Sequence, residues 1–350
     1  WELADMGIED SVVANGWLAG NTISELMETY LERIVGEDVY NYFGRQFPLL
    51  IKFLDINGKL SVQVHPDDDI AAERYDALGK SELWYVLEAE PDAKAYVGFK
   101  RDVTAQEFYD KCHDGTVHEL LNVIHPKKGD VIFIAPGTVH AADGKIQLVE
   151  IQESSDLTFR LYDWGREHNP ATARPIHLEE AIDLIDYRPY DMANYNPHHH
   201  GHSHEGQTVE TLVESDQFTV SKLNLTDPLH IYTEKFGSFI VYVCVEGSAS
   251  VQVPSTKENG EAYMENYEFK MGETIMIPAD MPDFFLVPRD RSTVLLEATC
   301  CPETDFDAYI DPDTDAFLEG EDYEGLEDGA FDDDDEPQTP AGASPLNFFS

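Results

Sequence analysis

Short apolar runs rich in β-branched and aromatic residues dominate the chain from about Phe47 onward. Gly, Asn, Asp and Pro separate these runs, a punctuation typical of short strands joined by turns. A first set of strands is expected at residues 49–54, 59–64, 83–87, 95–99, 131–134 and 146–153, and a second at residues 209–213, 218–225, 238–245, 249–253, 274–277 and 293–298. The pattern predicts a mainly β protein built from two sandwiches or barrels.

Helical signals are confined to a few shorter segments. Two Thr-x-x-Glu capping boxes, at residues 22–25 and 104–107, predict helices that run to about residue 34 and begin near residue 108. Residues 117–123 and 178–185 are further helix candidates. We expect the helices near residue 108 and at 117–123 to interrupt the first β unit without ending it.

Changes in composition divide the chain into five segments. We expect an N-terminal helical segment (1–45), a first β unit (46–168), a connector with a histidine-rich loop (169–205), a second β unit (206–302) and an acidic tail (303–350). The tail has the low hydrophobicity and high charge typical of disorder. Because the chain begins at Trp1 and not at Met, we expect further residues to precede it.

The chain is strongly acidic. Its 350 residues include 69 Asp and Glu against 23 Lys and Arg, a formal charge of −46, which argues against nucleic-acid binding. Of the acidic side chains, 17 lie between Cys301 and Pro340, and no Lys or Arg follows Arg291, so residues 1–300 retain a charge of −29. An anionic substrate therefore requires a local cluster of Lys or Arg at its site.

The cysteines and the apolar runs indicate the compartment. The four cysteines, at positions 112, 244, 300 and 301, are too few and too unevenly spaced for a disulfide framework, which favours a reducing compartment. No apolar run approaches the roughly 18 residues that span a bilayer, and no hydrophobic leader opens the chain. We predict a soluble cytoplasmic protein that binds neither membranes nor nucleic acid.

Two segments of the first β unit carry residues suited to metal binding. In Ser61-Val-Gln63-Val-His65, alternation along a strand places the three polar side chains on one face. In residues 129–140, a predicted strand ends in a Pro-Gly turn that directs His140 back toward the unit. Each histidine alone is more simply explained as a hydrogen-bonded core residue, but the pair favours one metal site.

The two segments resemble the paired motifs of cupins, in which a double-stranded jelly-roll barrel holds a metal on histidines and a carboxylate. Gln63 stands where cupins usually have their first histidine, and this departure is similar to type I mannose-6-phosphate isomerases. The resemblance is carried by residues 61–68, 79–85, 136–141 and 155–161. It is close over residues 1–166 and loose beyond them, and it implies two cupin jelly-roll barrels with short helical insertions.

The resemblance implies a metal site made by Gln63, His65, Glu82 and His140, with one zinc ion per chain. An amide oxygen, two imidazoles and a carboxylate suit a borderline divalent cation and leave positions for water or substrate. The ligands alone leave Mn, Fe and Co open. The implied activity is interconversion of mannose 6-phosphate and fructose 6-phosphate, an aldose–ketose isomerisation through a cis-enediol.

This isomerisation needs a base near the metal that moves a proton between C1 and C2. Lys80, two residues before Glu82, and Glu150, which matches an acidic pocket residue of the family, are both candidates, and the choice between them stays open. The resemblance places Arg160 at the family's catalytic arginine, whose planar fork can hold phosphate or a developing enediolate. Ser61 is a candidate phosphate ligand.

The second β unit repeats the strand pattern without this chemistry. Residues 272–282 align with the segment that ends at His140, and counting from the proline puts Pro282 in the position of that histidine. We therefore expect a degenerate second cupin without a metal site. The histidine tract at 198–204 lies in a predicted polar loop, and we interpret it as a linker with incidental metal affinity.

Two other classes of function compete with the isomerase. A non-catalytic cupin that binds a sugar phosphate or regulates a pathway is favoured where Lys80 or Arg160 is absent, and both are present. An iron cupin of the oxygenase type usually needs three histidines and a glutamate, and Gln63 argues against it. The sequence does not indicate the oligomeric state.

Overall fold

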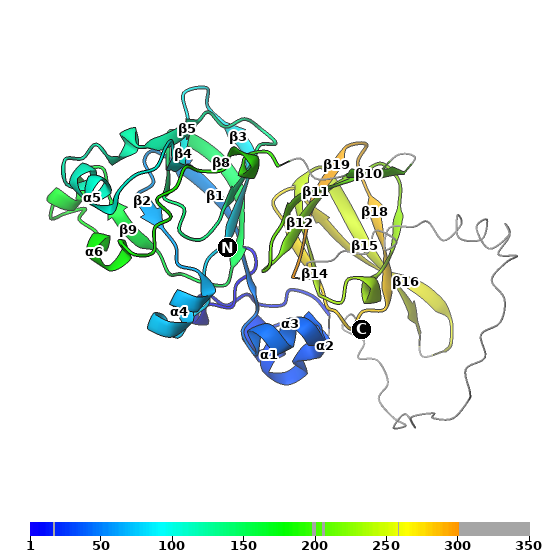
Figure 1. The fold of residues 1–350 in the computed structure, drawn as a ribbon. Helices are drawn as coiled ribbons and strands as arrows, with labels where there is room; N and C mark the ends of the chain where they lie inside the picture. Colours follow the sequence, from blue (N-terminus) through cyan, green and yellow to red (C-terminus); the bar gives the residue numbers. More distant parts are fainter. Residues whose placement is uncertain (17, 198–200, 205–206, 258, 301–350) are drawn as a thin grey trace, which may run out of the picture.

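The computed structural model describes residues 1–300 apart from 17, 198–200, 205–206 and 258. The predicted acidic tail therefore lies outside the described residues, as does the start of the histidine tract. Two β-rich halves stand side by side, with a group of short helices beneath the junction in the view of Figure 1. The prediction of a mainly β protein is confirmed.

The helices beneath the junction come from the N-terminal segment. They are α1 (Ile23–Tyr30), α2 (Glu32–Val35) and α3 (Glu37–Phe43), preceded by a 3-10 turn at Gly7–Glu9. Thr22 and Glu25 form the predicted capping box at the start of α1. The helix does not continue unbroken to residue 34, because Leu31 takes a positive φ of 51°, which an α-helix cannot accommodate.

The first half consists of two antiparallel sheets that face each other. One has the strand order β1 (Leu49–Asn57), β8 (Lys145–Glu153), β3 (Glu82–Ala89), β6 (Val131–Ile134); the other has β5 (Leu121–Ile124), β4 (Lys94–Phe99), β7 (His140–Asp143), β2 (Val62–Val64), β9 (Phe159–Tyr162). An apolar cluster that includes Trp84, Leu148 and Val97 fills the space between them. The polar side chains of the candidate site lie on these same inner faces.

Short helices cover the outer face of the second of these sheets. They are α5 (Ala105–His113) and α6 (Leu178–Ala181), while α4 (Asp68–Tyr75) lies at the rim near α1 to α3 (Figure 1). Phe108 of α5 and Leu178 of α6 pack with Val62 and Val64 of β2. The outward residues of β2 are therefore buried by helices, and its inward residue, Gln63, is left to face the other sheet.

The second half is also a pair of antiparallel sheets. One has the order β10 (Gly201–His204), β11 (Gln207–Glu214), β12 (Thr219–Leu225), β19 (Thr293–Thr299), β14 (Ile240–Glu246), β17 (Thr274–Ile277); the other has β13 (Leu229–Tyr232), β18 (Asp283–Pro288), β15 (Ser248–Thr256), β16 (Ala262–Lys270). Further 3-10 turns lie at Val117–Glu119, Arg166–His168, Met192–Asn194 and Thr233–Lys235.

One apolar cluster joins the two halves. The outer face of the β1-β8-β3-β6 sheet contributes Leu83 and Ile151, and the second half contributes Phe218 and Val241. Met27 of α1 extends this cluster into the N-terminal helices. Burying one such side chain is worth roughly 1.5–3 kcal/mol, so the shared cluster is a substantial part of the stability of both halves.

Several predicted elements differ from the structure. Residues 117–123 are not one helix, because the 3-10 turn gives way to β5, whose residues pair with β4. The strand predicted at 59–64 is reduced to β2, and the helix predicted at 178–185 to α6. The histidine tract is not wholly a loop, since residues 201–204 form β10 beside β11. None of the helices in the described part of the chain has the length and apolar character that a bilayer crossing requires.

Candidate metal centre and active site

His65, Glu82 and His140 bring a potential metal-ligand atom each to within 4.8 Å of the others, and all three are buried. His65 directly follows β2, Glu82 begins β3 and His140 begins β7, so the two sheets of the first half both contribute. Nε2 of His140 lies 3.0 Å from Oε1 of Glu82, and Nε2 of His65 lies 3.6 Å from Oε2. The three side chains therefore converge on one point.

Both histidines are held by backbone carbonyls. Nδ1 of His65 lies 2.9 Å from the carbonyl oxygen of Leu157, and Nδ1 of His140 lies 2.9 Å from that of Thr138. Because a carbonyl only accepts, each Nδ1 carries the proton and each Nε2 presents a lone pair. This is the arrangement by which proteins orient imidazole ligands toward a metal.

The electrostatics of the cluster keep His65 and Glu82 in protonation states that suit metal binding. Burial, followed by the positive charge of Lys80, lowers the pKa of His65 well below its ordinary value. Burial opposes ionisation of Glu82, but the charge of Lys80 and the nearby imidazoles hold the pKa of that carboxyl well below its ordinary value. A neutral imidazole and an ionised carboxylate result.

Gln63 completes the set predicted from the sequence. It is the Cα partner of His140 across β2 and β7, and its Nε2 lies 3.1 Å from Nε2 of His140. Its Oε1 accepts a hydrogen bond of 3.3 Å from the hydroxyl of Ser61. Rotation of the terminal amide of Gln63 by 180° directs Oε1 toward the cluster. The Ser61 hydroxyl can then accept a hydrogen bond from Nε2 of Gln63.

The turn before β7 fixes the distance between the two histidines. The amide of Gly137 donates to the carbonyl oxygen of His65 over 2.9 Å. Gly137 has φ of 78°, and a Cβ there would lie 2.9 Å from the carbonyl oxygen of Leu184, so only glycine fits this turn. The Pro-Gly turn singled out in the sequence thus ties the His65 backbone to the strand that carries His140.

These residues fit a divalent cation. Nε2 of His65 and both carboxylate oxygens of Glu82 are buried and lack a hydrogen-bond partner among the described residues. Burial of a carboxylate is costly, and beside the ion pair between Glu82 and Lys80 a bound cation would offset that cost further. Two imidazole nitrogens, one carboxylate and one amide oxygen are a donor set suited to zinc and its neighbours in the first transition series.

Comparison with known proteins agrees with this site. A family model described as phosphomannose isomerase type I, catalytic domain, matches residues 6–114. The mannose-6-phosphate isomerase ManA of Bacillus subtilis is 33% identical over 287 residues, which cover 82% of this chain and 85% of the relative. The chain belongs to the type I phosphomannose isomerase family. The resemblance inferred from the motifs is thereby confirmed.

Other members of the isomerase family match over similar lengths. A mannose-6-phosphate isomerase of Streptococcus mutans is 32% identical over 269 residues, covering 77% of this chain and 78% of the relative. The crystal structure of the Bacillus subtilis mannose 6-phosphate isomerase superposes with a TM-score of 0.72 at 28% identity, covering 85% of this chain and 88% of the other. The likeness therefore extends over both halves.

Lys80 lies beside the cluster of His65, Glu82 and His140, as the sequence predicted. Its Nζ is 3.4 Å from Oε2 of Glu82, and the lysine side chain is only 6% exposed. Glu150 is also buried, but both its oxygens are engaged: Oε1 lies 2.8 Å from Nζ of Lys52 and Oε2 accepts from Nε1 of Trp84 over 3.0 Å. The two candidate bases thus have different surroundings.

Lys52 is a feature of the site that sequence reasoning missed. It is the Cα partner of Glu150 across β1 and β8, its side chain is 11% exposed, and its Nζ also donates to Oε1 of Gln152 over 2.5 Å. A lysine inside the apolar run of residues 49–54 was a usable signal, because a charge on the inner face of a strand needs a partner.

Arg160 lies on β9 as the Cα partner of Gln63. Its Nη1 donates to the carbonyl oxygen of Pro175 over 2.9 Å, while its Nε is buried without a partner among the described residues. Burial, followed by the charge of Arg174, lowers the pKa of Arg160. The structure thus places this arginine beside the ligand strand, with a donor still unused.

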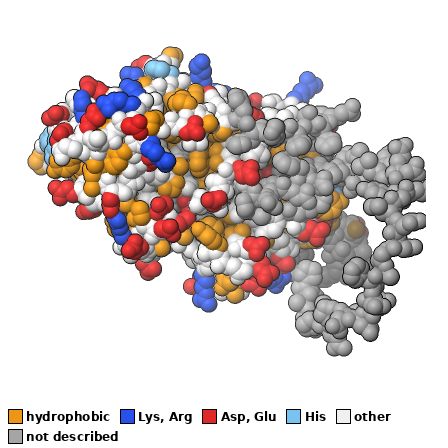
Figure 2. Space-filling view, in the orientation of Figure 1, with side chains coloured by type: hydrophobic (Ala, Val, Ile, Leu, Met, Phe, Trp, Pro, Cys, Tyr) orange, Lys and Arg blue, Asp and Glu red, His pale blue; other side chains and the backbone are white. Residues whose placement is uncertain are grey.

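Two further arginines, together with Asp163, lie close enough to Arg160 to act on its charge. Asp163 is fully buried and accepts hydrogen bonds of 2.5 Å from both Arg166 and Arg174. Three guanidinium groups gathered around one carboxylate leave a local excess of positive charge. Elsewhere acidic side chains prevail on much of the visible face, with small groups of Lys and Arg among them (Figure 2). Such a cluster is a source of the local positive field that an anionic substrate requires.

The second half differs at the matching positions. Its β13 and β18 pair Ile231 with Phe284, both fully buried, where β2 and β7 pair Gln63 with His140. Strand β18 begins at Asp283, one residue beyond the predicted Pro282, and that carboxylate faces His230 at 2.6 Å. The inner face of this pair is apolar, which removes the ligand atoms.

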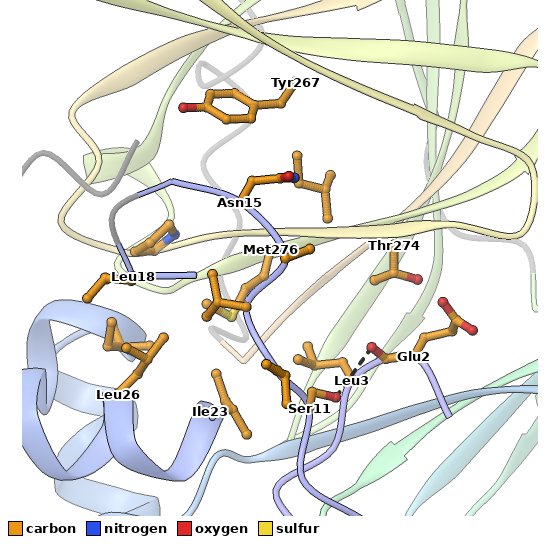
Figure 3. A pocket seen from close by; sticks show the side chains of 16 residues that line it. Glu2, Leu3, Ser11, Asn15, Leu18, Ile23, Leu26, Tyr267, Thr274 and Met276 are labelled. Atoms are coloured by element: carbon orange, nitrogen blue, oxygen red, sulfur yellow. Dashed lines mark hydrogen bonds between the residues drawn. The ribbon is translucent and has the colours of Figure 1, made fainter. Parts of the chain in front are cut away.

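A cavity of about 230 Å³ lies apart from the metal ligands, between the N-terminal segment and the second half. Figure 3 shows Leu18, Ile23, Leu26 and Met276 around it, with Tyr267 above them. Its lining is mostly apolar and includes none of the predicted ligands. The cavity is therefore separate from the candidate metal site.

Proposed function

We propose that this chain is a metal-dependent aldose–ketose isomerase that interconverts D-mannose 6-phosphate and D-fructose 6-phosphate. The observation that carries the proposal is the buried cluster of His65, Glu82 and His140, with unpartnered ligand atoms. Membership of the type I phosphomannose isomerase family supplies the substrate class. The relatives' names describe this activity in those proteins.

We assign the metal to Gln63, His65, Glu82 and His140, and we propose one zinc ion per chain. When bound, such an ion supplies Lewis-acid stabilisation of negative charge that develops on the sugar oxygens. The amide of Gln63 keeps the donor set less negative than a second carboxylate would. The balance of one carboxylate and three neutral ligands leaves the bound cation a net positive charge toward an anionic substrate.

Lys80 is our candidate for moving the proton between C1 and C2. Its Nζ faces the ligand Glu82 at 3.4 Å inside the buried site. Glu150 is the alternative, and its two oxygens already hold Lys52 and Trp84. Because both oxygens of Glu150 are already occupied by these donors, we favour Lys80 and give Glu150 a role in holding Lys52.

Arg160 is our candidate for binding the anionic substrate, together with the arginines on Asp163. Its unused Nε and its place opposite Gln63 support a position between the metal ligands and the positive cluster. A guanidinium can hold phosphate or a developing enediolate through two parallel hydrogen bonds. Ser61, hydrogen-bonded to Gln63, is a second polar group on the same face.

The finer architecture is also part of the proposal. We propose that residues 46–168 form a metal-binding cupin jelly roll, that 206–302 form a degenerate one, and that 1–45 and 169–205 are the helical segment and the connector. The facing sheets and the separate apolar cores support this division. Cys112 and Cys244 are free and buried, which supports the predicted cytoplasmic location.

Metal analysis and a coupled isomerase assay on one purified sample test the function. We expect about one divalent ion per chain and conversion of mannose 6-phosphate, with both lost in Glu82→Gln. Glu88→Gln changes an exposed residue of the same strand and is the matched control. A wild-type protein that holds metal and binds the sugar phosphate without converting it is the outcome that contradicts the proposal.

A further inference from the structure

Three consecutive backbone amides just before β3 are held by hydrogen bonds. The amide of Gly79 donates to Oδ1 of Asp68 over 2.9 Å, and that of Lys80 donates to the carbonyl oxygen of Pro66 over 3.0 Å. The amide of Ser81 donates to Oε2 of Glu153 over 2.6 Å. These residues carry Lys80 and lead directly into Glu82, so their backbone sets where both side chains lie.

The contact between this segment and α4 leaves no free space. A Cβ added at Gly79 would lie 2.5 Å from the backbone nitrogen of Asp68 and 2.6 Å from the carbonyl carbon of Asp67. Such distances are shorter than any side chain tolerates, so glycine is required here for close approach. The backbone of Gly79 therefore packs directly against that of Asp67 and Asp68.

The second half reaches the same segment through one side chain. Gln217, in the turn between β11 and β12, donates from Nε2 to Oδ2 of Asp68 over 3.3 Å. Its Oε1 accepts from the hydroxyl of Ser81 over 3.3 Å. The side-chain amide of Gln217 thus bridges Asp68 and Ser81.

Glu153 acts in this arrangement as a neutral acid. It is 1% exposed, and burial, followed by the negative charge of Asp68, raises its pKa to about 8. The other titratable groups around Asp68 are the hydroxyl of Tyr42 in α3, at 3.3 Å, and the exposed Asp69. A protonated carboxyl has nearly the same shape as a glutamine side chain, and each offers a carbonyl oxygen as acceptor beside a donor group.

We propose that Asp68, Glu153 and Gln217 are positioning residues that fix the Gly79–Ser81 segment and thereby the places of Lys80 and Glu82. Through Gln217, the second half of the chain thereby contributes to the geometry of the candidate metal site in the first half. The kinetic part of this inference rests on the proposed isomerase function. The structural part concerns metal affinity and stands independently of it.

Gln217→Ala is the decisive variant, because Gln217 touches none of the proposed catalytic or metal-binding side chains. A net hydrogen bond is worth about 0.5–1.5 kcal/mol, so we expect kcat to fall about threefold to tenfold with KM little changed. We expect zinc affinity, measured by competition with a chromophoric chelator and without sugar, to weaken by a similar factor. Gln252→Ala, a half-buried glutamine elsewhere in the second half, is the matched control.

A pair of variants at Glu153 separates positioning from mere loss of stability. Glu153→Gln keeps an acceptor for the Ser81 amide and is expected to retain zinc affinity and kcat within about twofold. Glu153→Leu keeps the volume without the acceptor and is expected to lose about tenfold or more in both. Equal behaviour of the two Glu153 variants, or wild-type kcat and zinc affinity in Gln217→Ala, overturns the proposal.

The two proposals can fail separately. If the wild-type protein binds zinc but does not isomerise mannose 6-phosphate, the proposed function fails, and the zinc measurements still decide the positioning role. If isomerase activity is present and Gln217→Ala matches wild type in kcat, KM and zinc affinity, the positioning role fails alone. Thermal midpoints of all variants are measured in parallel to show that they are folded at the assay temperature.

Discussion

The side-chain amide of Gln63 lies 3.1 Å from Nε2 of His140, and the two residues are partners across the β2–β7 ladder. This pairing means that the amide and the imidazole approach the same point from adjacent strands. A ladder fixes the separation of its Cα partners, so the distance between these ligands is set by the backbone. The position of Gln63 relative to His140 is therefore set by strand pairing.

Replacing Gln63 with leucine tests its role as a ligand. Leucine keeps much of the volume and removes the amide oxygen, so we expect zinc affinity to fall at least about tenfold. Competition with a chromophoric chelator measures the affinity without any assay of turnover. Gln147→Leu, at an exposed position of β8, is the control and should leave the affinity unchanged. An unchanged affinity in Gln63→Leu would remove this residue from the ligand set.

Arg160→Ala is expected to lower kcat/KM for mannose 6-phosphate by about a hundredfold, because it removes a preorganised donor aimed at negative charge. Steady-state kinetics in the coupled assay measure this. Arg188→Ala, at an exposed arginine paired only with its neighbour Asp186, provides the comparison. Turnover of Arg160→Ala within a few-fold of wild type shows that the assigned role is wrong.

A double-mutant cycle on Lys52 and Glu150 tests whether they form one buried unit. Their pair is 11% and 7% exposed, so Lys52→Met leaves a carboxylate uncompensated and should lower the free energy of unfolding by about 3 kcal/mol. Adding Glu150→Gln is expected to restore much of that loss. Urea unfolding of the four proteins gives the coupling energy, and additive effects of the single changes contradict the pairing.

The raised pKa of Glu153 predicts a pH-dependent stability with a definite sign. Burial and the charge of Asp68 raise the pKa to about 8, whereas an unfolded glutamate loses its proton near its ordinary value. Between those values the folded state holds the extra proton, so this group's contribution to stability falls as pH rises, by about 1.4 kcal/mol per unit. Below the unfolded pKa that contribution is fully present.

Glu153→Gln removes this proton and therefore the slope. We expect the variant to gain stability relative to wild type as pH rises from about 5 to 8, with no further gain above that. Urea unfolding at each pH gives the difference, in which the background of other acidic groups cancels. Glu88→Gln, at an exposed glutamate, should show no such trend. A difference that is constant with pH contradicts the assigned protonation.

Most of the site could be predicted because its residues lie in short motifs. Gln63 and His65 alternate along one strand, and the turn before His140 is marked by Pro136 and Gly137. Lys52 stands out as a charge within an apolar run, but its cross-strand partner Glu150 does not follow from local periodicity. Gln217 could not be found this way, because it acquires its role from contacts with the other half.

The elements that were not predicted from the sequence are short or polar. Strands β7 and β9 have four residues each, too short to show a period, and β16 alternates exposed and half-buried residues without a strong apolar face. Helix α4 begins at the last residue of the motif at 61–68 and contains three acidic residues and an arginine, so it resembles a polar loop in sequence. The capping boxes at residues 22–25 and 104–107, by contrast, marked the starts of α1 and α5 correctly.

Strand β3 has two different tasks on its two faces. Glu82 and Trp84 point to the metal side, while Leu83 and Tyr85 belong to the cluster shared with the second half. Because side chains alternate, the loss or gain of one residue here would exchange the two sets at once. An insertion or deletion in this strand is therefore expected to have two effects at once. It would move Glu82 away from the other candidate metal ligands, and it would disrupt the apolar contact between the two halves.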